Sequence, residues 1–119
     1  MSEARQTLAR RAEANVAALL RGRGFVVLGT NVRVGRLELD VIARRHDLLV
    51  VVEVRARSSD AFGSPLETID AAKVARVRRA TARWLDGRPD LRGVRVRFDA
   101  VGVLARGDEL EIDYCEDAF

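Results

Sequence analysis

The sequence predicts an α/β domain in which a mixed sheet of about five strands is flanked by helices, in the order α-β-β-β-α-β-β. Apolar residues recur at helical spacing in two segments, and five short runs rich in Val, Ile and Leu are separated by polar turns. A chain of 119 residues is long enough for one core of ordinary size and too short for two. We therefore expect residues 1–119 to form a single domain.

The first twenty or so residues are expected to form a helix. Their apolar side chains recur three or four residues apart, and Gly22 and Gly24 follow the last of them. These apolar positions are Leu8, Ala12, Val16, Leu19 and Leu20. Because they form one stripe, this helix must pack its apolar side against another element.

Three sequential strands are predicted next, over residues 25–30, 36–44 and 48–57. The segment RRHD reads as the hairpin turn between the second and the third. If this turn centres between His46 and Asp47, the numbers of directly opposed residues sum to 93. Strand alternation then divides the second strand into a face with Glu38, Asp40 and Ile42 and a face with Leu37, Leu39, Val41 and Ala43.

A second helix follows the loop SSDAFG. It is predicted to begin either at the capping box Ser64-Pro65-Leu66-Glu67 or at Asp70, and to end near Asp86. Two more strands, over residues 94–104 and 109–114, complete the sheet. One stripe of the helix carries Ile69, Lys73, Val77, Ala80 and Trp84, so Lys73 is expected on the buried side.

The predicted register brings two acids together. Asp40 lies opposite Glu53, and Glu38 lies opposite Arg55. Directly opposed Cβ atoms are only about 4.5–5.5 Å apart, where like charges are destabilising. A divalent cation would reconcile Asp40 with Glu53, and a site made of oxygen atoms suits Mg²⁺ or Mn²⁺. The alternative is that these acids are solvated and that Glu38 and Arg55 form an ordinary cross-strand pair.

The composition excludes several other classes of protein. The formal charge of +3 is a modest basic excess that favours polyanionic partners. The single Cys115 excludes an internal disulfide, and with only His46 there is no zinc cluster of the Cys/His kind. The longest apolar run, residues 48–52, is far below the roughly 18–20 residues of a membrane span, and the N-terminus lacks a signal peptide's apolar stretch. We expect a cytoplasmic protein without a membrane partner.

One lysine stands out among the basic residues. The 21 basic residues are twenty arginines and Lys73. Lysine is a compact charge that can lose its proton, whereas arginine is forked and permanently charged. Position 73 is therefore a candidate for a role that arginine cannot fill, although a lysine that extends past the edge of the core or pairs with an acid is the alternative.

Three segments carry a resemblance to a known family. The segments GRLELDVIARR, VVVEVRARSSDAFGSPLETIDAAK and RFDAV resemble the YraN-like family of small bacterial proteins, from about Glu13 to Phe119. That family looks like part of the PD-(D/E)XK nuclease superfamily, which includes restriction endonucleases and archaeal Holliday junction resolvases. The resemblance implies a restriction endonuclease-like core. It also implies that Arg97, Phe98 and Asp99 are mainly structural.

The resemblance implies a set of site residues. Asp40 matches the superfamily's metal-binding aspartate, and Glu53 matches the acid of the (D/E)XK element. Glu38 and Glu13 match further acids, and the carbonyl of Val54 is an expected additional ligand for Mg²⁺ or Mn²⁺.

Arg55 departs from the superfamily pattern, which usually has lysine at this position. Arginine can stabilise charge on a phosphate, but its pKa is too high for a general base. Lys73 is expected to supply the missing ammonium from the second helix. Catalytic residues implied by the resemblance are thus Asp40, Glu53, Arg55 and Lys73.

The expected function is that of a metal-dependent endonuclease acting on phosphodiester bonds, with structured or branched DNA favoured over RNA. Arg57, Arg76 and Arg79 are expected to bind the nucleic-acid backbone. Because junction-resolving relatives act as symmetric dimers, a homodimer is one expected assembly. The alternatives are a non-catalytic nucleic-acid-binding module of the same fold and a protein-interaction domain whose acids pair with arginines.

Overall fold

In a computed structural model that describes residues 3–59, 61 and 63–119, the predicted order α-β-β-β-α-β-β is confirmed. Residues 1 and 2 of the expected first helix, and residues 60 and 62 of the loop SSDAFG, lie outside the described residues. The elements are α1 (Glu3–Gly22), β1 (Val26–Val34), β2 (Leu37–Arg45), β3 (Leu48–Arg57), the 3₁₀ turn η1 (Pro65–Thr68), α2 (Ala71–Asp86), the 3₁₀ turn η2 (Pro89–Leu91), β4 (Arg95–Arg106) and β5 (Glu109–Cys115).

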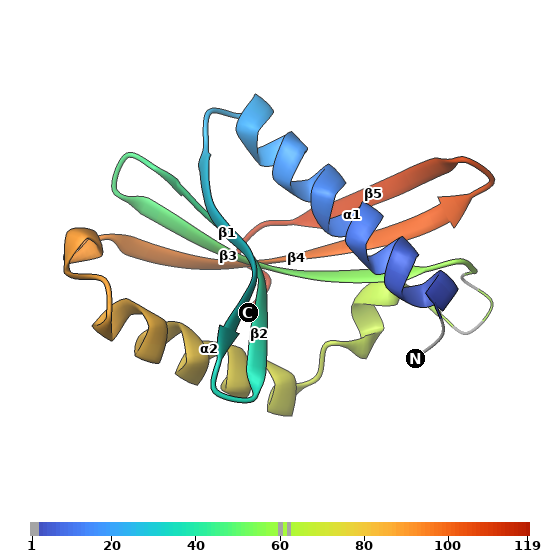
Figure 1. The fold of residues 1–119 in the computed structure, drawn as a ribbon. Helices are drawn as coiled ribbons and strands as arrows, with labels where there is room; N and C mark the ends of the chain where they lie inside the picture. Colours follow the sequence, from blue (N-terminus) through green and yellow to red (C-terminus); the bar gives the residue numbers. More distant parts are fainter. Residues whose placement is uncertain (1–2, 60, 62) are drawn as a thin grey trace.

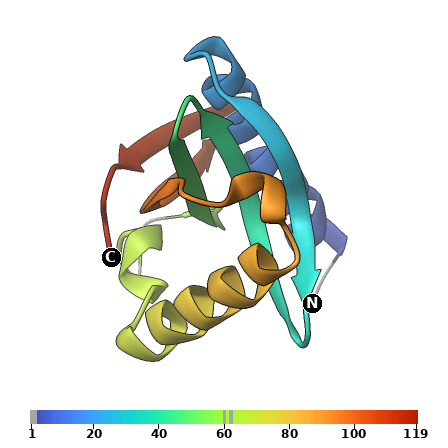
Figure 2. The ribbon, with the colours of Figure 1, turned by 90° about the vertical axis from the view of Figure 1, so that its left-hand side faces the viewer.

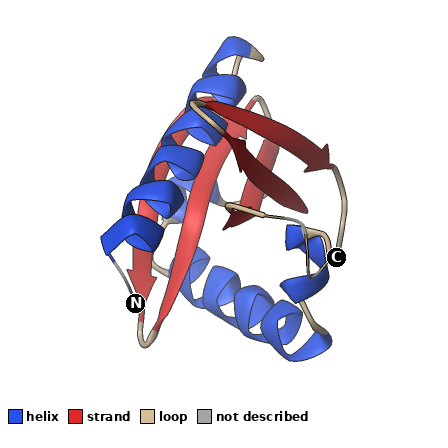
Figure 3. Ribbon diagram, turned by 90° about the vertical axis from the view of Figure 1, so that its right-hand side faces the viewer, coloured by secondary structure: helices blue, strands red, loops and turns tan. Residues whose placement is uncertain are grey.

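The five described strands form one mixed sheet in the order β1-β2-β3-β4-β5. Neighbouring strands are antiparallel except for β3 and β4, which are parallel and are joined through α2. The two long helices lie on opposite faces of the sheet (Figures 1 and 2). Figure 3 shows the same arrangement of helices and sheet from the side opposite to Figure 2. Each face of the sheet therefore has its own apolar layer.

Two hydrophobic clusters fill these layers. Under α1, buried side chains of the helix meet those of β2, β3 and β4; under α2, a second set meets the other face. The α1 cluster includes Ala12, Val16, Leu20, Val50, Val52 and Val101, and the α2 cluster includes Leu39, Ile42, Leu49, Val51, Val77 and Ala80. β3 contributes to both, which explains its nearly continuous run of apolar residues.

Both proposed starts of the second helix are real caps, but of different elements. The Ser64 hydroxyl accepts a hydrogen bond from the amide of Leu66 at 3.3 Å and caps η1. The Asp70 carboxylate accepts one from the amide of Lys73 at 2.8 Å and caps α2. The capping box therefore starts a separate 3₁₀ turn, and the α-helix begins after Asp70.

The predicted register of the β2–β3 hairpin is confirmed over five pairs, from Arg45 with Leu48 to Val41 with Val52. Each pair sums to 93, and His46 takes a left-handed turn conformation with φ of 55°. Beyond Val41 and Val52 the pairing stops. β2 and β3 then diverge, so the first part of β2 pairs only with β1 (Figure 1).

The predicted alternation along β2 is wrong at this point of divergence. Leu39 packs in the α2 cluster, whereas Val41 and Ala43 pack in the α1 cluster, although all three were expected on one face. The physical reason is that β2 stops pairing with β3 at Asp40 and from there pairs only with β1. The strand twists at this point, so the residues before and after Asp40 face different helices. Asp40 therefore sits where the regular pattern is interrupted.

Candidate functional site

The site begins in the fork where β2 and β3 part. Counted outward from the hairpin turn, the last hydrogen-bonded pair is Val41 with Val52. Asp40 and Glu53 are the next residues beyond it, one on each strand. The carboxylate of Asp40 accepts a hydrogen bond from the amide of Val54 at 2.9 Å, so a side chain replaces the missing strand partner. The backbone of the fork thus holds Asp40 toward β3, near the acid that the sequence predicted it would oppose.

Glu53 is the least satisfied polar side chain of this fork. It has 0% exposed surface, and neither carboxylate oxygen has a hydrogen-bond partner. Its two cationic neighbours are Lys73, with Nζ 3.5 Å from Oε2, and Arg55, with Nη2 3.6 Å from Oε2. A good charge-assisted hydrogen bond is about 2.7–2.9 Å long, so both contacts are electrostatic and loose.

Burial is the main reason that the pKa values of Glu53 and Asp40 are raised. Burial, followed by the negative charge of Asp40, raises the pKa of Glu53 to about 7, against the opposing effect of Lys73 and Arg55. Burial also raises the pKa of Asp40, and the Val54 hydrogen bond opposes that rise. Two buried carboxylates in one place favour a shared proton or a cation.

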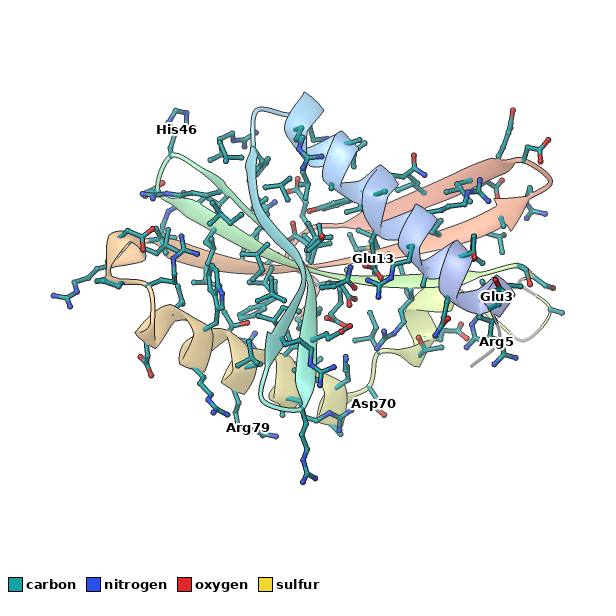
Figure 4. The ribbon with its side chains drawn as sticks, in the orientation of Figure 1. Glu3, Arg5, Glu13, His46, Asp70 and Arg79 are labelled. Atoms are coloured by element: carbon teal, nitrogen blue, oxygen red, sulfur yellow. The ribbon has the colours of Figure 1, made fainter. Side chains whose placement is uncertain are left out.

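A third acid reaches the fork from α1. The Glu13 side chain is 12% exposed, and its Oε2 atom is buried without a hydrogen-bond partner. Burial and the charge of Asp40 raise its pKa, whereas a hydrogen bond with Asn31 lowers it. Figure 4 places Glu13 on the side of α1 that faces the sheet.

Glu38 is placed differently from the prediction. Its carboxylate lies 3.8 Å from Arg33 Nη1 on the neighbouring strand β1, and β2 does not pair with β3 at this level. The expected cross-strand pair of Glu38 with Arg55 is therefore wrong, because the strands have already diverged. The charge of Glu38 still acts on the site by raising the pKa values of Asp40 and Glu13.

The chemistry of the fork suits a hard cation. Its buried carboxylate oxygens without hydrogen bonds, two on Glu53 and one on Glu13, are the donor type that Mg²⁺ and Mn²⁺ prefer. Within residues 3–59, 61 and 63–119, however, no three acidic, histidine or cysteine side chains converge closely enough to hold a metal ion. Asp40 and Glu53, with Glu13 as a further acid whose pKa the charge of Asp40 raises, are therefore the expected ligands; like the Val54 carbonyl, they stay a prediction.

A cavity of about 680 Å³ opens beside the fork. Glu13 and Arg55 line it together with Arg57, one of the three arginines expected to bind a nucleic-acid backbone. The other two, Arg76 and Arg79, lie along α2 and line a different hollow. The structure therefore brings the predicted acids, Arg55 and Lys73 together, but it divides the predicted backbone-binding arginines between two places.

Sequence reasoning missed several polar residues of this cavity. Ser58, Ser59 and Thr68 line it from the loop after β3 and from η1. Asn31 was also missed, and its φ of 51° is a conformation that asparagine tolerates better than most residues. A polar asparagine within an apolar strand was the available signal for it.

The segment Arg97-Phe98-Asp99 is structural, as expected. Both oxygens of Asp99 accept hydrogen bonds from Arg97 at 2.9 Å, and further bonds come from the Tyr114 hydroxyl and the Asp117 amide. Phe98 is buried in the α2 cluster. This network ties β5 and the C-terminal residues to β4.

Known proteins are similar to this chain over most of its length. The family model described as uncharacterised protein family UPF0102 matches residues 12–103. This chain belongs to the UPF0102 family. The match confirms the predicted YraN-like membership, and the matched segment contains every acid of the fork together with Arg55 and Lys73.

UPF0102 relatives come from several bacteria. A UPF0102 protein of Sorangium cellulosum is 45% identical over 104 residues, covering 86% of this chain and 72% of the relative. One from Leifsonia xyli is 43% identical over 97 residues, covering 82% and 81%. One from Syntrophotalea carbinolica is 37% identical over 119 residues, covering 100% and 96%. In these three matches the similarity covers 82–100% of this chain and 72–96% of the relative.

None of the described helices is both long and apolar enough to cross a membrane.

Proposed function

We propose that this UPF0102 protein is a metal-dependent, nuclease-like protein of the PD-(D/E)XK superfamily with a restriction endonuclease-like core, and that it acts on phosphodiester bonds of structured or branched DNA. One observation carries the proposal: a fully buried Glu53, with neither oxygen hydrogen-bonded, shares a strand fork with Asp40. A protein gains nothing in stability from an unsatisfied buried acid, so a ligand is the economical explanation.

The acids of the fork would hold the metal. Asp40 and Glu53 are the principal ligands in this proposal, and the carbonyl of Val54, Glu13 or Glu38 completes the set. When bound, Mg²⁺ or Mn²⁺ lowers the pKa of a coordinated water and polarises the phosphate. The raised pKa values of Asp40 and Glu53 support this role, since a divalent cation favours the ionised form of both groups.

The cations of the fork would stabilise charge on the phosphate. Lys73 and Arg55 lie within 3.6 Å of Glu53, so both are close to the place where a phosphate would meet the acids. Arg55 cannot accept a proton near neutral pH and acts only electrostatically. Arg57 lines the adjoining cavity, where it can contact the backbone next to the reacting phosphate.

A second candidate function is a nucleic-acid-binding module without cleavage. The same two cations favour it, because Lys73 and Arg55 already compensate the charge of Glu53. In this alternative the fork is a structural ion cluster, and the basic cavity binds backbone phosphates. The two functions differ in whether phosphodiester bonds are cut.

A cleavage panel decides between the two functions. The substrates are a duplex, a flap, a four-way junction and a single strand, each end-labelled and incubated with Mn²⁺. We expect the wild type to cut at least one of the branched substrates, and we expect Asp40→Asn and Glu53→Gln to lose at least 100-fold in rate, as is typical when a central electrostatic group is removed.

Asp108→Asn serves as the matched control, since Asp108 is an exposed acid in the β4–β5 turn. It should cut like the wild type. Binding of these substrates without cleavage under Mn²⁺ would favour the module, and cleavage that survives both fork variants would refute the proposed site.

A further inference from the structure

Four arginines line a hollow between α2 and the turn that joins β1 to β2. The hollow has a volume of about 490 Å³, and no acidic residue lines its described wall. The arginines are Arg36 from the turn and Arg76, Arg79 and Arg83 from α2. This is a separate place from the cavity beside Glu53, which has different lining residues.

The four guanidinium groups are available to a ligand. In the part of the chain that the structure describes, none of them forms an ion pair with an acid. Other arginines of the described residues do form ion pairs, as Arg88 does with Asp90. Four unpaired positive charges around one hollow repel each other, so an anion there is favourable.

The fold aligns these arginines. At about 100° per residue, Arg76, Arg79 and Arg83 fall within a sector of about 60° and extend over about 10 Å of helix. Figure 4 shows Arg79 pointing away from the sheet, on the outer side of α2.

The turn closes the other side of the hollow. Gly35 has φ of +62°, and a Cβ atom there would lie 3.0 Å from Nη1 of Arg83. The glycine therefore permits both the tight turn and the close approach of the guanidinium group. It brings Arg36 to the same hollow as the arginines of α2.

The lining between the arginines is apolar. It consists of Val34, Leu37 and Ala80, which are buried or half-buried. A duplex offers phosphates to such a site, but its bases are stacked inside. An unpaired strand offers phosphates and bases together. Bases stack on guanidinium planes, and an unstacked base also packs against apolar side chains.

We propose that this arginine hollow binds a short single-stranded segment of nucleic acid, with phosphates on the guanidinium groups and a base against the apolar lining. The inference deepens the proposed function by naming the form of the nucleic acid, and it rests on that function for the polymer as partner. A free nucleotide has the same chemistry, so the test must distinguish the two sources.

The test measures binding of a fluorescein-labelled dT15 strand by anisotropy as a function of NaCl, in EDTA. Without metal, the result does not depend on cleavage. We expect Arg79→Gln/Arg83→Gln to weaken binding at least tenfold and to reduce the slope of log K against log salt by about 1.4, which is about 0.7 for each lost phosphate contact. Both residues are exposed, so the variant should keep its fold.

The matched control is Arg21→Gln/Arg92→Gln, which removes two exposed arginines outside the hollow. It should bind dT15 within twofold of the wild type. Equal weakening by both double variants would overturn the proposal, because the effect would then be net charge alone.

Two further ligands test the base and the source. A 15-residue abasic strand should bind the wild type at least fivefold more weakly than dT15, and equal binding would refute the base contact. Free dTMP should displace dT15 only at millimolar concentration. Displacement at micromolar dTMP would overturn the strand as the ligand in favour of a nucleotide.

Discussion

Glu53 has no exposed surface and no hydrogen bond to either carboxylate oxygen, and its neighbours include another acid. Such a residue lowers the stability of the protein unless a proton or a cation neutralises it. Lys73 and Arg55 do so only in part, because their nitrogen atoms lie 3.5 and 3.6 Å from the carboxylate. The loss of folding stability caused by the ionised Glu53 therefore depends on pH and can be measured.

The first prediction concerns that pH dependence. The pKa of Glu53 rises from 4.5 to about 7 on folding, so the folded protein holds the proton more tightly than the unfolded chain does. The contribution of protonated Glu53 to the free energy of unfolding is fully present below pH 4.5 and is lost as the pH rises through 7. Since one pKa unit corresponds to about 1.4 kcal/mol, the loss is on the order of 3 kcal/mol by pH 8.

Glu53→Gln removes this titration. In EDTA, the free energy of urea unfolding of the wild type should fall relative to that of Glu53→Gln between pH 5 and pH 8. Glu109→Gln, which changes an exposed acid on β5, should follow the wild type. Parallel pH profiles of wild type and Glu53→Gln would show that Glu53 has an ordinary pKa.

At the residue scale, the sequence predicted which residues lie at the site better than it predicted which of them contact each other. Asp40, Glu53, Lys73 and Arg55 do gather in one fork. The register predicted that Asp40 meets Glu53, and the family resemblance implied that Arg55 and Lys73 join them. The partner of Glu38 was wrong because it depended on where β2 leaves β3, and a strand pattern carries no signal for the last paired residue. The half-buried Glu13 was likewise visible in the sequence only through family resemblance.

At the element scale, α2 positions the one lysine of the chain. Asp70 caps the helix by accepting a hydrogen bond from the amide of Lys73 itself. The cap therefore fixes the first turn of the helix and with it the start of the side chain that reaches Glu53. Loss of the cap should lower the stability of the protein and loosen the position of Lys73 beside Glu53.

The second prediction follows from this cap. Asp70→Ala should lower the free energy of unfolding by about 1 kcal/mol, the usual cost of losing an N-cap side chain. Ser64→Ala, which removes the cap of the short η1 turn, is the matched comparison and should cost less, because its hydrogen bond is longer at 3.3 Å. Urea unfolding measures both. A larger loss for Ser64→Ala would contradict the assignment of Asp70 as the principal cap.

The boundaries of helices and strands could be predicted where one residue or one turn determined them. Gly22 ends α1, and the turn around His46 sets the register of β2 against β3. The start of α2 was ambiguous because two valid caps, Ser64 and Asp70, stand six residues apart. The alternation of β2 failed because twist and strand divergence depend on the whole sheet, which period-two spacing does not encode.

At the scale of the whole molecule, the fork exists because helices cover both faces of a mixed sheet. The α1 cluster and the α2 cluster cover both faces of β3. Glu53 is therefore buried even though β2 no longer pairs with β3 at this position. α1 supplies Glu13 from one side (Figure 4), and α2 supplies Lys73, which contacts Glu53 from the other. The acids therefore come together only in the complete fold.

The distribution of arginines is also a property of the whole molecule. The sequence indicated a basic excess and suggested Arg57, Arg76 and Arg79 as backbone-binding residues. It could not show that Arg57 lies beside the fork while the other two join Arg36 and Arg83 in a second hollow. That grouping depends on the β1–β2 turn meeting α2, a contact between segments about forty residues apart in the chain.

The central claim is that Asp40 and Glu53 form one metal site, and calorimetric titration of the purified protein with Mn²⁺ at pH 7.5 tests it most directly. We predict that the wild type and the control Asp108→Asn bind one Mn²⁺ per chain, and that Asp40→Asn and Glu53→Gln bind none. A wild type that takes up no Mn²⁺, or an Asp40→Asn variant that binds it as the wild type does, would contradict the claim.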